Sequence, residues 1–517
     1  MALPSSLVLE LRSDTGADVN GGSFDPAAAI PGTDYTYPTS SPITYTDLVI
    51  QATATNVSSA ARAFVAADVG NTINVTGGTG FTVGRYSVRS VAAGIATLDA
   101  AVGTAASTGG AGTLGGAWGT YDAMMTYLAT LSSNQAAGWT IWVRAASGYT
   151  TTTTSNTHNC AGTAALRINY RGYGTVRGDT GVPVITTNGG SWAFMIGAYW
   201  TVRQMKIVSG TSTSGPGFRI YGDNTRVEDC FVSGLTGGPG FLCDLGAQAL
   251  FTRCYATTCQ TGFTVNGYGR SLNNCVAETC GTGFSLVGQS NTCLDMTYLT
   301  AINSTGDGFQ MTASVAFWYC IATGSGANGF NYTSGAGSDL LRMLNCYAGQ
   351  SAQYGFKSST PAIPNAQRLI GCGFYSNTSG HTNLTPALPA GNVSLTAAPF
   401  VNPSASDYRL NNAAGGGALL RGAGTPVTVG PSWLSPWNAV TSATDIGVYQ
   451  HATPALGLTV TGTPPVLVWD ADPRSTKYDV LGFLGAAYTV LIANTTATTY
   501  TDSSGAGYTS YSVVGVP

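Results

Sequence analysis

A repeat of about 24 residues constrains the fold of this chain more than any other feature. Between Thr201 and Cys372 an apolar residue is followed, three positions later, by a cysteine or methionine. We place the sulfur residues at Met205, Cys230, Cys254, Cys275, Met296, Cys320, Cys346 and Cys372, with steps of 25, 24, 21, 21, 24, 26 and 26 residues. Gly-Phe pairs recur in phase, with the phenylalanine at Phe218, Phe241, Phe263, Phe284, Phe309, Phe330 and Phe356.

The repeat unit predicts one coil of a right-handed parallel β-helix. Its short apolar stretches alternate with Gly, Ser, Thr and Asn, which favour turns, and none of it has a helical period. Stacked coils lie about 4.8 Å apart, so equivalent residues form columns. We therefore expect an all-β fold of about ten coils with an internal column of Cys and Met side chains.

Composition narrows the classes of function. Charged residues make up 9% of the 517 residues, against about 25% in a typical globular protein, yet 44% are hydrophobic, which argues against disorder. The net charge of −3 argues against a nucleic-acid partner. No stretch approaches the roughly 18 apolar residues of a membrane span, and no signal peptide opens the chain, although a non-standard export route stays open.

The eleven cysteines fit the predicted columns, where a thiol behaves as a small buried hydrophobe. Cys254 with Cys259, and Cys275 with Cys280, share one spacing that is offset by 21 residues. A four-cysteine zinc site is the alternative, but the spacing is wrong for zinc and the columns explain the offset. We expect no metal and no cofactor. Reduced thiols suit assembly in a bacterial cytoplasm, with disulfides between coils as an alternative.

The regions around the repeat differ from it. Residues 1–115 are predicted to form an N-terminal β-rich docking domain, a small sandwich or barrel, in which 103–116 is a linker or loop. Residues 116–450 should hold a capping helix and the solenoid, with a first strand at 139–143 and final irregular coils at 400–410 and 445–449. Residues 455–517 have strands at the spacing of a β-sandwich.

One amphipathic helix is expected before the solenoid. Thr120 is a suitable N-cap. The apolar face of the helix consists of Tyr121, Met124, Met125, Leu128 and Leu131. An uncapped first coil would expose apolar surface and unpaired backbone groups, so the helix should cover the open end of the solenoid.

Three resemblances to known families follow from these residues. The coil pattern, Tyr121-Asp122-Ala123, Asp407-Tyr408-Arg409-Leu410 and Asp445-Ile446-Gly447 resemble the pectate-lyase-like β-helix superfamily over 116–450. The stretch from Asn71 to Gly78, with Gly84-Arg85-Tyr86, is similar to β-helix proteins of tailed bacteriophages. Residues 455–517 resemble a fibronectin type III domain, with Trp469 and Tyr511 at its core positions. The seventh strand of that family is missing, which implies a shortened domain or strand addition from a neighbouring chain.

The phage resemblance implies a virion protein: a spike, fibre or capsid decoration on the particle surface. Its partners would be other virion structural proteins and host surface glycans, and because related spikes bundle in threes, a homotrimer is the first expectation. The rival hypothesis is a depolymerase that cleaves host polysaccharide, and a third is a secreted bacterial adhesin.

A depolymerase of the inverting type needs two acids about 6.5–9.5 Å apart. The candidate carboxylates of the solenoid are Asp223, Glu228, Asp229, Asp244, Glu278, Asp295, Asp307 and Asp339. We favour isolated solvated side chains and assign no catalytic residue, because the signatures of polygalacturonases and pectate lyases are not found. The three histidines, His158, His381 and His451, are scattered and suggest no triad or metal cluster. Aromatic residues that could stack on sugar rings are Tyr268, Tyr298, Trp318, Tyr332, Tyr354 and Tyr375, and none is assigned to a site.

Overall fold

The chain divides into two compact units, Met1–Ala398 and Pro399–Pro517. The computed structural model describes residues 8–14, 16–24, 43–131, 134, 136–145, 148–152, 155–157, 160–175, 177–188, 192–210, 214–244, 249–266, 271–287, 294–312, 315–333, 341–359, 369–403, 407–411, 413–420, 423–424, 459–461, 464–468, 477–484, 487–497, 499–503 and 510–516. In these parts no helix is long and apolar enough to cross a membrane.

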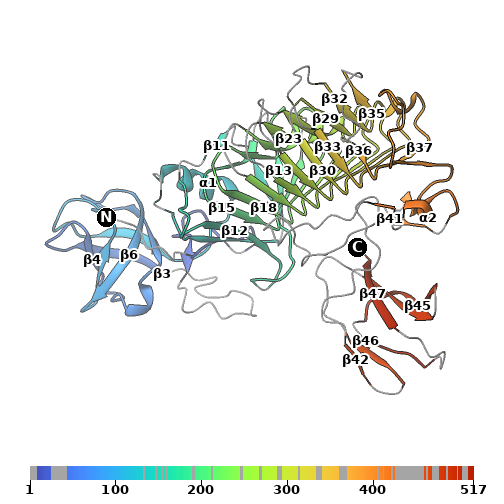
Figure 1. The fold of residues 1–517 in the computed structure, drawn as a ribbon. Coiled ribbons are helices and arrows are strands. Elements are labelled where there is room, and N and C mark those ends of the chain that lie inside the picture. Colours follow the sequence, from blue (N-terminus) through green and yellow to red (C-terminus); the bar gives the residue numbers. More distant parts are fainter. Residues whose placement is uncertain are drawn as a thin grey trace. The chain divides into compact units, whose positions relative to one another are not determined.

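The first unit contains a parallel β-helix of three sheets, which confirms the predicted fold class (Figure 1). Sheet 1 has 12 strands in the order β2 (Ser23–Phe24), β1 (Val8–Leu11), β9 (Thr140–Arg144), β12 (Ile168–Tyr173), β15 (Trp200–Arg203), β18 (Thr225–Glu228), β21 (Ala249–Thr252), β24 (Ser271–Asn273), β27 (Leu294–Thr297), β30 (Val315–Trp318), β33 (Leu341–Leu344) and β36 (Leu369–Ile370). Its strands are parallel except for the β1–β2 pair.

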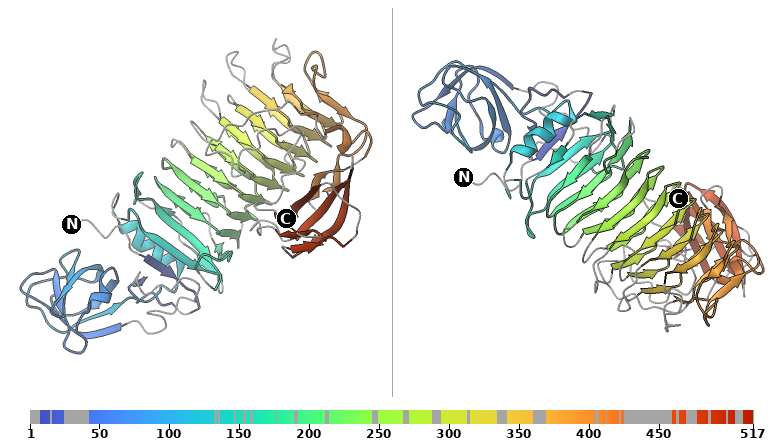
Figure 2. Two further views of the ribbon diagram at one scale, coloured as in Figure 1. Left: turned by 60° about the horizontal axis from the view of Figure 1, so that its bottom comes forward. Right: turned by 90° about the horizontal axis from the view of Figure 1, so that it is seen from above.

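The other two sheets complete each coil, and their strands stack in register (Figure 2). Sheet 2 has 11 strands: β10 (Tyr149–Thr151), β13 (Val184–Thr187), β16 (Lys206–Ser209), β19 (Phe231–Ser233), β22 (Tyr255–Thr257), β25 (Val276–Glu278), β28 (Thr300–Ile302), β31 (Ile321–Thr323), β34 (Tyr347–Gly349), β37 (Gly373–Tyr375) and β39 (Val393–Leu395). Sheet 3 has 10: β11 (Ser155–Thr157), β14 (Trp192–Ile196), β17 (Phe218–Ile220), β20 (Pro239–Cys243), β23 (Thr261–Asn266), β26 (Thr282–Val287), β29 (Phe309–Met311), β32 (Phe330–Tyr332), β35 (Tyr354–Ser358) and β38 (Gly380–Thr382).

The Gly-Phe pairs form one internal column in sheet 3, as the repeat predicts. Rings from Phe218 to Phe330 stack with neighbouring centroids 4.5–5.2 Å apart and nearly parallel planes. Each preceding glycine lies against the next coil: a Cβ on Gly262 would come within 2.6 Å of both the Gly283 carbonyl oxygen and the Ala277 Cβ. In each Gly-Phe pair the phenylalanine therefore places its ring in the core, and the glycine occupies a position where a larger side chain does not fit.

The sulfur column forms at the turn between sheets 1 and 2. The residue before each cysteine has positive φ, 54° at Asp229 and 51° at Asn274, which turns the chain sharply. Each thiol fills the inner corner and donates a weak hydrogen bond to the carbonyl two residues earlier, with Sγ–O distances of 3.2 Å from Cys230 and 3.4 Å from Cys275. A cysteine thus fills the volume of the turn, and its thiol is a second, weak donor to a carbonyl that already accepts a backbone hydrogen bond from a neighbouring coil.

The predicted register was wrong at one coil of this column. Met296 pairs with Leu272 and Phe317 and so occupies the apolar position of the repeat, and Leu299 follows Cys275 in the column. The two steps there are 24 and 21 residues rather than 21 and 24. Both positions accept the same residue types, and Cys293, which suggested the other phase, lies outside the described residues.

The capping helix is confirmed. It is α1 (Tyr121–Thr130), and the Thr120 hydroxyl accepts a hydrogen bond from the Ala123 backbone N–H. Tyr121, Met124, Met125 and Leu128 are buried in the same hydrophobic core as the first coils. The first parallel strand of the solenoid is β1 rather than the predicted strand at 139–143, which is β9, the parallel neighbour of β1.

A closed barrel lies in the sequence between β2 and α1. Its strand order is β3 (Ile43–Ile50), β4 (Asn56–Ser58), β7 (Ile95–Leu98), β6 (Gly84–Ala92), β5 (Thr72–Gly77) and β8 (Gly110–Leu114), with a 3-10 turn at Ala66–Asp68. Part of the region interpreted as a linker, 103–116, is therefore a strand. β8 pairs with both β3 and β5, and its glycines fit because a Cβ on Gly110 would come within 2.4 Å of the Phe81 ring.

The second unit consists of short antiparallel sheets. β40 (Phe400–Asn402) and β41 (Asp407–Leu410) pair with each other rather than forming a coil, which corrects the prediction for 400–410, and α2 (Gly417–Leu420) follows. Two further sheets have the orders β42 (Thr459–Thr461), β43 (Val466–Val468), β46 (Thr499–Thr501) and β45 (Ala487–Thr495), β44 (Lys477–Leu484), β47 (Ser510–Val516). The predicted strand at 445–449 and Trp469 lie outside the described residues, so the fibronectin resemblance stays a prediction.

Candidate functional site

The candidate carboxylates are spread over all three sheets. Glu228 ends β18 in sheet 1, and Asp229 occupies the turn that follows. Glu278 ends β25 in sheet 2, whereas Asp244 follows β20 in sheet 3. The structure therefore does not gather them on one face. Asp223 is exposed in the turn before β18, the side chain of Asp295 in β27 is not described, and Asp339 lies outside the described residues.

Five of these carboxylates bond to a side chain about one coil away in sequence. Glu228 meets Arg203 at 2.8 Å. Asp229 binds Arg253 through two parallel hydrogen bonds, 2.6 Å from Nε to Oδ1 and 2.7 Å from Nη2 to Oδ2. Their arrangement joins adjacent coils, and we call these contacts inter-coil staples.

The other staples follow the same plan on sheets 2 and 3. Asp244 accepts a hydrogen bond from Arg219 Nε at 2.8 Å. The Tyr255 hydroxyl donates to Glu278. Asp307, in the turn before β29, accepts from the Asn328 backbone at 3.0 Å and from the Asn331 side chain at 2.7 Å. These acids thus link neighbouring coils.

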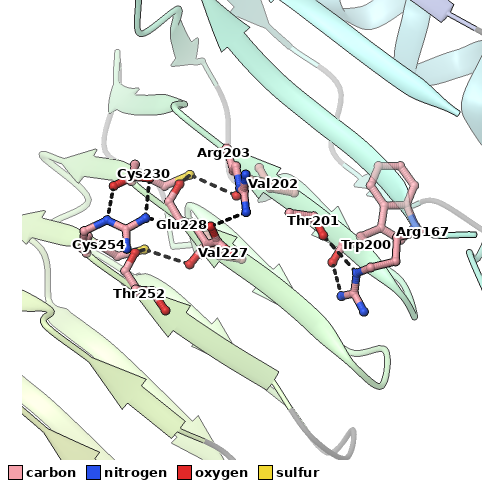
Figure 3. A network of polar contacts seen from close by, with 12 residues as sticks. Arg167, Trp200, Thr201, Val202, Arg203, Val227, Glu228, Cys230, Thr252 and Cys254 are labelled. Carbon is pink, nitrogen blue, oxygen red and sulfur yellow. Dashed lines mark hydrogen bonds and ion pairs between the residues drawn. The ribbon is translucent and has the colours of Figure 1, made fainter. Parts of the chain in front are cut away.

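A cluster of arginines on sheet 1 went unnoticed in the sequence analysis, and Figure 3 shows two of them, Arg203 beside Glu228 and Arg167 beside Trp200 and Thr201. Tyr170, Val202 and Val227 point into the core, so the residues that follow them point outward. Register places Trp142, Arg171, Arg203 and Glu228 in one outward column on successive strands. Arg226 lies in the neighbouring outward column beside Thr201. We call Arg167, Arg171, Arg203 and Arg226 the arginine face.

Arg167 extends across the next strand. Its guanidinium donates to the Thr201 hydroxyl at 3.0 Å, to the Trp200 carbonyl at 3.0 Å and to the Asn224 carbonyl. Burial lowers the pKa of Arg167, and the charge of Arg226 lowers it further. Burial also lowers the pKa of Arg171, with the charge of Arg203 as the second cause. Like charges are therefore close together here, on adjacent coils for Arg171 and Arg203 and two coils apart for Arg167 and Arg226.

The four cysteines that suggested a zinc site stand in two separate columns. Cys254 and Cys275 follow sheet 1, whereas Cys259 and Cys280 follow sheet 2. All ten cysteines that the structure describes are free and buried. Among the described residues, no three His, Cys, Asp or Glu side chains form a group that could hold a metal ion.

The remaining candidates do not converge on a site. His381 Nε2 lies 2.8 Å from the Ser394 hydroxyl, and burial lowers its pKa, while His158 and His451 lie outside the described residues. Tyr332 belongs to the core, and Tyr298 is buried and stacked on Tyr319 at 5.3 Å. Three aromatic candidates are half-buried: Trp318, Tyr354 and Tyr375. Tyr268 lies outside the described part of the chain.

Comparisons with known proteins bear on the fold alone. No protein-family model and no curated protein matches the chain. Among solved structures, pectate lyase Pel9A aligns with 65% of this chain and 92% of its own, at 15% identity and a TM-score of 0.46. The A-module of the Azotobacter vinelandii mannuronan C-5 epimerase AlgE6 aligns with 53% of this chain and 93% of its own, at 12% identity and a TM-score of 0.33.

A GH87 α-1,3-glucanase catalytic domain in complex with nigerose covers 68% of this chain and 89% of its own, at 10% identity and a TM-score of 0.29. The fold itself is established by the three stacked parallel sheets and their shared register. Residues 8–24 and 140–395 form, in their described parts, a solenoid with a three-sheet parallel β-helix fold.

Proposed function

We propose that this chain is a structural protein on the exterior of a bacteriophage virion, a head decoration, fibre or spike. The observation that carries the proposal is the use of the carboxylates. Glu228, Asp229, Asp244, Glu278 and Asp307 each bond to a side chain of a neighbouring coil. A hydrolase needs two acids that face a bound substrate. Acids that join coils instead support a rigid rod.

The architecture supports the same role. Continuous backbone ladders run through sheets of 12, 11 and 10 strands. Ten steps of about 4.8 Å give a rod roughly 50 Å long. The resemblance of the stretch from Asn71 to Gly78 to phage β-helix proteins supports the virion location, with the barrel as the docking part. We propose a homotrimer that contacts other virion proteins and host surface glycans.

The test is to locate and count the protein in purified particles. Cryo-EM of particles from the source culture, combined with quantitative mass spectrometry, should find it at fixed positions on the outer surface. Many copies on the head would make it a decoration or head fibre, whereas a few copies at the tail would make it an adsorption spike. Absence from the particles would overturn the proposal.

One observation keeps the depolymerase as a second candidate. Glu228 and Asp229 are consecutive in the chain and adjoin the arginine face, where an acidic sugar could be held. If the chain cleaves polysaccharide there, Glu228→Gln and Asp229→Asn should each abolish the shortening of an acidic polysaccharide measured by size-exclusion chromatography. We expect the unaltered chain not to shorten the polysaccharide. If it does shorten it, and both variants fail to do so, the result would favour the depolymerase.

A further inference from the structure

We propose that the arginine face binds an oxyanion group, a carboxylate or phosphate, carried by a surface glycan. This inference deepens the glycan contact of the proposed function and rests on it. It concerns the outward side of the first coils of sheet 1, where register brings guanidinium groups together without an equal number of acids.

The first step is the register itself. Arg171 and Arg203 are direct partners on the parallel strands β12 and β15. Like charges directly opposite each other on neighbouring strands are destabilising. Within the described residues, the nearest carboxylate in this column is Glu228, on the far side of Arg203 at 2.8 Å. The pair Arg171–Arg203 therefore has no acid between its members.

The second step is the donor capacity that remains. The Nε atoms of Arg171 and Arg203 are buried and have no hydrogen-bond partner among the described residues. Arg203 is still 35% exposed and Arg226 is exposed, so an incoming group can reach both guanidinium groups. Planar guanidinium groups bind carboxylate and phosphate with two parallel hydrogen bonds. An oxyanion between adjacent coils would relieve the repulsion and bind the exposed parts of the Arg203 and Arg226 guanidinium groups.

The third step concerns how the guanidinium groups are held. Arg171 Cζ lies 5.9 Å from the centroid of the Trp142 ring, and Arg177 Cζ lies 5.6 Å from it. Arg167 is fixed by its hydrogen bonds to the Thr201 hydroxyl and the Trp200 carbonyl. Aromatic contact and backbone acceptors orient both side chains without neutralising them. The charge of the face is thus positioned in advance of binding.

The fourth step selects the kind of anion. The chain has a net charge of −3, and Asp223, Glu228 and Asp229 lie on the same coil as Arg226. A polyanion with dense phosphates, such as nucleic acid, would meet these carboxylates as well as the arginines. A polysaccharide with widely spaced acidic groups can place one of these groups at the arginines. Its neutral sugars can then lie beside the carboxylates of the protein without repulsion.

The experiment measures binding of the full chain to alginate, to neutral dextran of matched length, to inorganic phosphate and to a single-stranded DNA oligonucleotide. The test variant is Arg171→Gln combined with Arg226→Gln. The matched control is Arg342→Gln, an exposed arginine in the same outward column of sheet 1 as Arg226 but several coils away. Titration calorimetry at low and at moderate salt provides the dissociation constants.

We expect the unaltered chain and R342Q to bind alginate equally, and the double variant to bind it about tenfold more weakly or worse. Binding should weaken with salt, and dextran should not bind. The double variant should also melt at an equal or higher temperature in the absence of anions, because a like-charge contact is removed. A purely structural role for these arginines would lower it.

Equal alginate binding by the double variant, or tighter binding of DNA than of alginate, would overturn the inference. Binding of inorganic phosphate without binding of alginate would show that the arginine face binds a free anion. That result would also overturn the inference that a glycan carries the anion. These assays use isolated protein. Alginate binding by a protein that is absent from particles would therefore refute the virion proposal alone.

Discussion

At the scale of single residues, the solenoid depends on positions where a side chain has almost no choice. The glycines of the Gly-Phe pairs from Gly217 to Gly329 lie against the carbonyl of the next glycine in the stack, and small alanines such as Ala277 and Ala301 fill the space opposite. Because the coils repeat, this constraint recurs with the same geometry on successive coils. The constraint comes from the close approach of neighbouring atoms and not from the backbone conformation, since the φ of Gly262 lies outside the left-handed region.

Gly262→Ala should lower the free energy of unfolding of the solenoid by about 1–3 kcal/mol, because its Cβ would meet two atoms at 2.6 Å. Gly148→Ala is the matched control, since its Cβ would lie 3.7 Å from the Val184 carbonyl oxygen and its effect should stay within about 0.5 kcal/mol. Urea unfolding followed by circular dichroism measures both. Equal effects would show that the close approach does not matter.

The thiols provide a second test at this scale. Burial raises the pKa of Cys160 to about 12 and also raises that of Cys230, so both thiols stay protonated at pH 8. We expect iodoacetamide to leave all ten described cysteines unmodified in the native protein and to modify them after denaturation in urea. Peptide mass spectrometry assigns each site. Rapid modification of native Cys259 or Cys280 would contradict the buried columns.

At the scale of elements, features set by local sequence patterns could be predicted from the sequence, and features set by long-range contacts could not. The capping helix and the stacked coils follow from spacing within a few dozen residues, and both were predicted. The assignment of β1 to the solenoid could not be predicted in this way. It depends on Glu10, fully buried, whose carboxylate bonds to Arg12, Tyr173 and Arg177. Two of these partners lie more than 160 residues away.

Two other features escaped prediction for related physical reasons. The strand β8 is rich in glycine, which is typical of loops, and only the Phe81 ring and the neighbouring strands explain its composition. The arginine face has no motif, because its members are separated by whole coils. One local signal did exist: Arg171 and Arg203 each follow an inward apolar residue directly, which places both on the outer surface.

The inter-coil staple between Asp229 and Arg253 can be measured by a double-mutant cycle. Both residues have positive φ, so Asp229→Asn and Arg253→Gln are better choices than alanine or a β-branched residue. We expect a coupling energy of about 0.5–1 kcal/mol, because the pair is bidentate but partly exposed and screened by water. The coupling should fall in 1 M salt. A coupling near zero would show that the bond adds nothing to the stacking of coils.

At the scale of the whole molecule, the first compact unit has a hydrophobic core made entirely of its own residues. Met1–Ala398 contains a continuous core that runs from Leu9 and α1 to Phe374. A continuous stack of coils with a helix at one end has what it needs to fold without the second unit.

A shortened chain of residues 1–398 should therefore be soluble and should unfold within about 4 °C of the corresponding transition in the full chain, a shift that corresponds to less than about 1 kcal/mol. Differential scanning calorimetry, with circular dichroism to assign the β signal, compares the two. A shortened chain that aggregates or melts much earlier would show that residues 399–517 contribute to the stability of the solenoid.

The position of the barrel in the chain has a mechanical consequence. Because the barrel is inserted between β2 and α1, two chain segments connect it to the first coil, and Gly21 and Gly22 donate to the Gly115 and Gly116 carbonyls at 2.8 Å where those segments meet. Arg85 of the barrel also contacts the Trp118 ring, with Cζ 5.2 Å from its centroid. These contacts resist rotation of the barrel against the first coil, so torque applied to the barrel passes into the solenoid.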